Sequence, residues 1–259
     1  MRGRAVMMVI LAGAALSPAA RAQSIEDRIG AVRDGKVRMS FAARPGVYGN
    51  GRNSISFGDR GRSFESEDWT PDWRSGPVRV VLRMRRGEVT DVDTYVAGEW
   101  LPAGDETLDL GTVSAPRAAE YLLELARSAE GDAGKEAILP AALADSATVW
   151  PQLLRIARDG SLPSETRKSA VFWTGQAAGE AATSGLAEIV YDEAAGREVR
   201  EVAIFALSQR PRDEGVPALI RIVRENRDPA LVKKALFWLG QSGDPRALAL
   251  FEEILEKGG

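Results

Sequence analysis

The 259-residue sequence contains no cysteine and no histidine. Without cysteine, disulfides, thiolate nucleophiles and cysteine-ligated zinc sites are excluded. Histidine is the side chain that titrates near neutral pH and the commonest ligand of transition metals, so its absence excludes Ser-His-Asp triads and nearly all zinc or iron sites.

Motifs for other kinds of catalysis are also missing. No serine stands three residues before a lysine, and neither a G-x-S-x-G elbow nor a Walker A loop occurs. A carboxylate pair for glycoside hydrolysis is compatible with the composition, but no particular pair is singled out. We therefore predict a protein that is not an enzyme, with no catalytic residues, no cofactor and no metal site.

A surplus of positive charge is absent as well. The net charge is −3, and the first 22 residues hold Arg2, Arg4 and Arg21 but no acid, so the remainder is more acidic still. Binding to nucleic acid requires lysines and arginines that neutralise phosphates. The charge balance therefore predicts that nucleic acid is not a partner.

Long apolar runs are scarce, and the clearest one lies at the N-terminus. Basic Arg2 and Arg4 precede an apolar run over 5–16, which is followed by Ala20-Arg21-Ala22. This order predicts a signal peptide over residues 1–22 and a periplasmic or secreted protein. A membrane anchor is the alternative, but the run is shorter than the roughly 20 apolar residues that span a bilayer. We thus expect no stable membrane insertion after cleavage.

Residues 23–113 have the pattern of a small β-rich module. Ile25, Ile29 and Val32 predict a short helix over 24–35, and alternating apolar residues predict strands over 36–41, 78–84 and 89–96. The last two strands are joined at Arg86-Gly87, which predicts a hairpin. A long loop, 46–76, separates the first strand from the second.

Three aromatic residues of this loop are candidates for partner binding. They are Tyr48, Trp69 and Trp73. Aromatic side chains stack on sugars or peptides with little loss of conformational entropy, but they also close the cores of small β modules. If they bind, an envelope polysaccharide is a possible ligand.

The remainder of the chain, 114–259, has a helical pattern that repeats. Val171-Phe172-Trp173-Thr174-Gly175-Gln176 aligns with Ile204 to Gln209 and with Leu236 to Gln241, at a period of about 33 residues, and Ala137-Ile138-Leu139 is a fainter copy. Each copy is followed by a second apolar helix. One such helical hairpin cannot bury its apolar faces alone, so the pattern predicts a solenoid that folds without the β module.

The segments 167–173 and 231–240 resemble the first helix of short bacterial HEAT repeats. Ankyrin repeats require a histidine, and the Trp, Leu-Gly and Tyr spacing of tetratricopeptide repeats is absent. The resemblance covers roughly residues 133–257. The whole layout also resembles uncharacterised exported bacterial proteins with HEAT repeats behind a β-rich module, which implies an envelope location and no known reaction.

Charged residues recur at equivalent positions of the second helices. Arg155, Glu188, Arg221 and Glu252 alternate in sign on the outward face. Helices that pack lie roughly 10 Å apart, within reach of long side chains. We expect ion pairs between repeats; a charged groove for a protein partner is the alternative.

The first helices share a stripe of Phe and Gln. For Phe172, Phe205 and Phe237 we expect packing against the adjacent repeat, and for Gln176, Gln209 and Gln241 we expect buried amides that hydrogen-bond to loop backbone. A ladder of ligand contacts is the alternative.

These patterns predict a mostly α fold, an α-solenoid of HEAT-like helical hairpins preceded by a small β-rich module. The predicted function is an exported, non-enzymatic scaffold that binds a protein partner through its repeat surface. A carbohydrate- or envelope-polymer-binding protein that uses the loop aromatics is the alternative.

Overall fold

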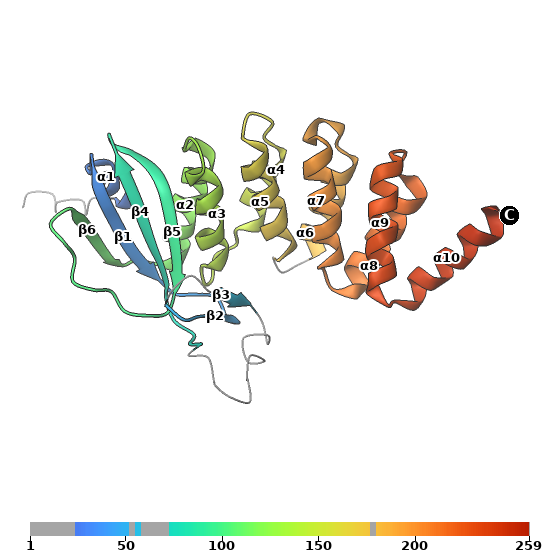
Figure 1. Ribbon diagram of the computed structural model, residues 1–259, viewed down its shortest axis with the longest axis horizontal. Coiled ribbons are helices and arrows are strands. Elements are labelled where there is room, and N and C mark those ends of the chain that lie inside the picture. The colour runs from blue at the N-terminus through green and yellow to red at the C-terminus, as the bar shows by residue number, and fades with distance from the viewer. Residues whose placement is uncertain (1–23, 52–54, 58–72, 177–179, 259) are drawn as a thin grey trace, which may run out of the picture.

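A computed structural model describes residues 24–51, 55–57, 73–176 and 180–258. The predicted signal peptide therefore lies outside the described residues. The molecule is elongated, with a β-sheet at one end, a stack of helical hairpins beside it and the C-terminal helix at the other end (Figure 1). The predicted fold class is confirmed.

The sheet has four strands in the order β5-β4-β1-β6. Strand β1 (Gly35–Phe41) pairs antiparallel with β4 (Val78–Arg85), which pairs antiparallel with β5 (Glu88–Val96). The turn between β4 and β5 contains Arg86 and Gly87, both with positive φ. Two such residues form the tight turn whose twist matches that of the strands, so the predicted hairpin is confirmed.

Two features of the β module differ from the prediction. The helix α1 (Ile25–Gly30) is shorter than expected, and β1 begins at Gly35. Glycine is required there, because φ is 117° and a Cβ would lie 2.4 Å from the carbonyl oxygen of Glu106. Strand β6 (Thr107–Thr112) pairs parallel with β1 and was not predicted. Only Leu110 of this edge strand is buried and Leu108 is half-buried, so the apolar pattern of the strand is short.

The segment predicted as a long loop is partly ordered into a second hairpin. Strand β2 (Val47–Gly49) pairs antiparallel with β3 (Ile55–Phe57). The ring of Phe57 lies 5.3 Å from that of Trp173 in the helical stack. The small hairpin therefore lies against the helices rather than extending from the sheet into solvent.

The change from strand to helix falls between Thr112 and Ala115. The helices in chain order are α2 (Ala115–Ser128), α3 (Ala133–Leu143), α4 (Trp150–Arg158), α5 (Ser164–Gly175), α6 (Glu180–Tyr191), α7 (Arg197–Ser208), α8 (Arg212–Glu225), α9 (Pro229–Ser242) and α10 (Pro245–Gly258), with a short 3₁₀ turn, η2 (Glu193–Ala195), before α7. Four hairpins, α3–α4 to α9–α10, follow the predicted repeat. Pro140 lies inside α3 and does not interrupt it.

The helices form two layers. The first-helix layer contains α3, α5, α7 and α9, each packed against the next, and the second-helix layer contains α2, α4, α6, α8 and α10. At the start of the stack, α3 packs against β5 and β4 instead of another first helix. The sheet thus occupies the place of a preceding repeat.

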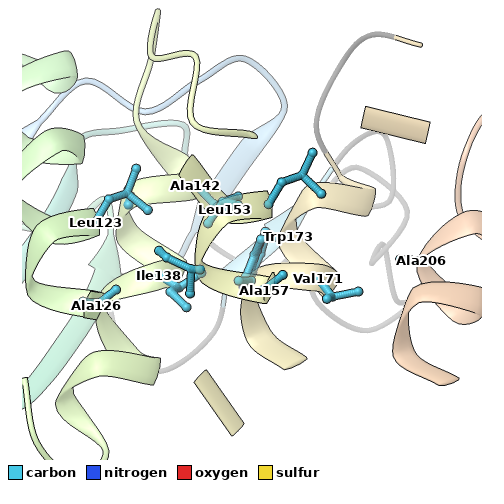
Figure 2. Packing of buried hydrophobic residues seen from close by; sticks show 14 of the residues in the cluster. Leu123, Ala126, Ile138, Ala142, Leu153, Ala157, Val171, Trp173 and Ala206 are labelled. Atoms are coloured by element: carbon cyan, nitrogen blue, oxygen red, sulfur yellow. The ribbon is translucent and has the colours of Figure 1, made fainter. Parts of the chain in front are cut away.

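A single apolar core runs through both parts of the chain. Large and small residues alternate along it, with Leu123, Ile138 and Leu153 beside Ala126 and Ala142 (Figure 2). Alanines at the interfaces let helix backbones approach closely, and larger side chains fill the remaining space. Because this core includes residues of the sheet, such as Phe41 and Leu82, the β module is a structural part of the stack.

The C-terminal helix α10 buries only some of its apolar residues. In α10, Ala247 and Leu250 are buried, but Leu248 and Leu255 are 60% and 76% exposed. The last helix therefore leaves apolar side chains in contact with solvent.

Candidate interaction surfaces

Aromatic side chains form a continuous row along the first-helix layer. Ring contacts link six residues in the spatial order Phe57, Trp173, Phe172, Phe205, Trp238 and Phe237. The distances between neighbouring ring centroids are 5.0 to 6.2 Å, the range of favourable aromatic pairs. We call this row the aromatic ladder.

The repeat explains how the ladder forms. Helices α5, α7 and α9 each present a Phe at the same position, and Phe172 stacks on Phe205 at 6.2 Å with nearly parallel rings. Phe205 then contacts Trp238 at 5.0 Å. The expectation that Phe172 and Phe205 pack against the adjacent repeat is confirmed.

The ladder is partly open to solvent. Phe237 is 56% exposed and Phe57 is 36% exposed, whereas Trp173 is buried. On α9, Leu231 and Leu239 are buried, whereas Phe237 lies on the exposed side of the helix. An extended surface of rigid apolar rings is typical of protein-binding sites.

The three glutamines next to the ladder are not the buried amides that we expected. Gln209 and Gln241 are exposed, and Gln176 is half-buried. The Gln209 Nε2 donates to its neighbour Ser208 Oγ at 3.1 Å, and the backbone carbonyl of Gln176 accepts from Arg44 at 3.3 Å. Gln209, Gln241 and Trp238 line a shallow pocket of about 390 Å³ between α7 and α9. These amides thus lie on the surface beside the ladder.

The role that we expected for the glutamines is held by arginines that the sequence patterns did not reveal. Arg167 is buried, and it donates from Nε to the carbonyl of Ala157 at 3.1 Å and from a terminal nitrogen to that of Ala195 at 2.7 Å. Arg200, in the next repeat, donates from Nε to the carbonyl of Val190 at 2.8 Å. Each arginine satisfies a carbonyl at the end of the preceding second helix, which has no partner inside that helix. Arg167 and Arg200 occupy equivalent positions in consecutive repeats, so the repeat alignment could have singled them out as structural residues.

The charged residues predicted as partner contacts lie on the second-helix layer. Arg155, Glu188 and Arg221 are exposed on α4, α6 and α8. The predicted ion pairs between them are wrong by about one helical turn, because Glu188 pairs with Arg158 at 2.6 Å and Arg221 pairs with Glu225 of its own helix at 2.8 Å. Arg224 and Glu253 form a second pair between repeats.

The predicted aromatic contacts of the β module are divided. Tyr48 is half-buried in β2, and Trp73 is half-buried next to Arg74, which forms a bridge with Gly49. Trp69 lies outside the described residues. The bridge between Gly49 and Arg74 brings the neighbouring residues Tyr48 and Trp73 close together. The three charged residues lie elsewhere, on the second-helix layer. The predicted residues therefore do not form one site.

One further side chain connects the sheet to the stack. Glu136 of α3 accepts a hydrogen bond from the backbone N–H of Val92, on β5, at 3.0 Å. Burial, with Asp91 nearby, raises the pKa of Glu136 above its ordinary value. The carboxylate satisfies a strand-edge donor that has no strand partner on that side.

The sequence comparisons agree with this geometry. Residues 183–258 match the family model for HEAT repeats, over α6 to α10. The segment from α6 to α10 is therefore made of HEAT repeats, and the helices before it continue the same stack of helical hairpins. No curated protein matches the chain. HEAT repeats are generally protein-interaction modules. Within the part of the chain that the structure describes, none of the helices combines the length and apolar character of a membrane span.

Proposed function

We propose that this protein is an exported, non-enzymatic scaffold that binds another protein along the aromatic ladder of its HEAT stack. The ladder carries the proposal, because it joins three repeats and the β2–β3 hairpin into one row of rings. Rigid aromatic side chains contribute a large share of the binding energy at protein interfaces. The absence of cysteine and histidine supports a binding role over a catalytic one.

Site-specific cross-linking tests the binding surface. A photo-reactive amino acid is placed at Phe237, which is 56% exposed on the ladder, and in a matched variant at Leu101, which is 81% exposed in the β module. We expect a discrete cross-linked protein from envelope extract at position 237 and none at position 101. Equal cross-linking at both positions would contradict the proposal.

Export is supported by the basic, apolar and Ala-x-Ala order of the first 22 residues. It is tested by mass spectrometry of the protein purified from its native envelope. We expect a mature N-terminus at Gln23, and an intact Met1 would overturn this part of the proposal.

A further inference from the structure

A cavity lies where the β4–β5 turn of the sheet meets the second-helix layer. This turn is at the end of the sheet away from the β2–β3 hairpin (Figure 1). The cavity has a volume of about 910 Å³ and lies between the β4–β5 turn, α1, α2 and the start of α4. This is the upper part of the size range of ligand and peptide pockets. We call it the junction groove.

The floor of the groove is apolar. Ile29, Met84 and Leu125 are buried there, and Tyr121 is half-buried beside them. Burial, with a smaller contribution from Glu26, raises the pKa of Tyr121 to about 12, as expected for a phenol packed against apolar side chains. The floor thus favours an apolar side chain that has been removed from water.

The rim of the groove is acidic. Five carboxylates line it, from Glu26, Glu88, Glu120, Glu124 and Glu130, against two guanidinium groups, from Arg117 and Arg155. Arg117 already pairs with Glu26 at 2.8 Å and with Glu120. Glu124 has a long contact of 3.4 Å with Arg127. The groove therefore keeps an excess of negative charge around an apolar floor.

We infer that the junction groove binds a lysine- or arginine-rich segment of a protein partner, with an apolar side chain of that segment on the floor. The charge of the rim selects the cationic residues, and the floor selects the apolar one. This inference adds a second contact to the proposed scaffold function, and it uses a surface that does not include the ladder.

Binding is measured by calorimetry with a defined probe, an amphipathic peptide of leucine and lysine. We compare a variant with Glu88→Lys and Glu124→Lys to a control with Glu252→Lys and Glu256→Lys, which changes the net charge equally at exposed positions of α10. We expect the groove variant to weaken binding roughly tenfold, since each reversed charge contributes a moderate Coulomb energy. The control is expected to bind like the natural protein.

The lack of cysteine permits a test of position. An environment-sensitive dye is attached to a single cysteine introduced by Ser128→Cys, on the groove, or by Ser184→Cys, on exposed α6. Addition of the peptide is expected to change the emission of the dye at 128 and not of the dye at 184. Circular dichroism confirms that each variant is folded, and the milder pair Glu88→Gln and Glu124→Gln is expected to weaken binding by a smaller factor.

Three results would overturn the inference: no binding of the peptide, equal weakening in both charge-reversed variants, or equal binding of a peptide in which serine replaces leucine. The last two would indicate diffuse attraction to an acidic protein. None of them bears on cross-linking at Phe237, so failure of this inference is distinguishable from failure of the proposed function.

Discussion

At the scale of single residues, the stack depends on a few polar side chains that satisfy buried backbone groups. Arg167 is the clearest, because it is buried and its two hydrogen bonds join α4, α5 and the η2 turn. A charged donor in such a place contributes more than a surface pair does, since its removal leaves carbonyl oxygens without partners.

We expect Arg167→Met to lower the free energy of unfolding by about 2 to 4 kcal/mol, because methionine keeps the packing and loses both hydrogen bonds. The control is Arg158→Met, which removes the exposed ion pair with Glu188 and is expected to cost under about 1 kcal/mol. Both are measured by urea unfolding, and similar costs would contradict the assignment.

Gln209→Ala and Gln241→Ala should each change the free energy of unfolding by under about 0.5 kcal/mol, because both side chains are exposed. This reverses the expectation from the sequence, which assumed buried amides. Urea unfolding of the two variants tests it, and a loss of a few kcal/mol would restore the structural role.

Asp244 gives the stack a defined acid sensitivity. Hydrogen bonds from the Arg246 side chain and backbone lower the pKa of Asp244 to about 2 from its ordinary 3.8. Because the pKa of Asp244 is lower in the folded state than in the unfolded state, its carboxylate stabilises the fold fully above pH 3.8. This stabilisation is lost as the pH falls through the pKa of the folded state. We expect the stability difference between the natural protein and Asp244→Asn to shrink between pH 4 and pH 2, in urea unfolding at a series of pH values. A pH-independent difference would contradict this.

At the scale of helices, close approach decides which small residues are required. A Cβ on Gly175, at the end of α5, would lie 2.9 Å from the Cβ of Ala206 on α7, whereas a Cβ on Gly240 of α9 meets nothing nearer than Phe251 at 4.0 Å. The two glycines align in the repeat, but Gly175 is the last residue of α5 and Gly240 lies inside α9. Substitution at Gly175 therefore tests packing, and substitution at Gly240 tests helix propensity.

Gly175→Ala should therefore destabilise the protein by about 1 to 3 kcal/mol, as α5 and α7 are forced apart. Gly240→Ala should stabilise it by up to about 1 kcal/mol, because alanine favours the interior of an exposed helix. Thermal unfolding followed by circular dichroism measures both signs. A Gly175→Ala variant as stable as the natural protein would contradict the close approach of α5 and α7.

At the scale of the whole molecule, the sheet and the helices share one core. Strand β5 packs on α3, Ala43 forms a bridge with Ala144, and Glu136 accepts from Val92. Removing the β module would expose the first-helix face of α3. Each HEAT hairpin depends on its neighbours, and here the neighbour of the first hairpin is a sheet.

A fragment of residues 114–259 is accordingly expected to remain helical but to melt at a lower temperature than the full chain, with α2 and α3 losing structure first. Hydrogen exchange resolved by segment measures this loss. The same melting temperature in both proteins would support the sequence-based expectation that the repeats fold independently.

The sequence alone determined the repeat, the helical hairpins, the strands β1, β4 and β5 and the turn at Arg86-Gly87, because hydrophobic periodicity and turn chemistry are local properties. It also placed Phe172, Phe205 and Phe237 at equivalent positions. Only the tertiary structure decided that these rings join with Trp173 and Phe57 into one ladder, that Gln209 is exposed while Arg167 is buried, and that Glu188 pairs with Arg158. Those outcomes depend on the offset between neighbouring repeats and on how the sheet meets α3. Distances between helices and strands depend on packing between residues far apart in the sequence. The periodicity within one helix or strand gives no information about those distances.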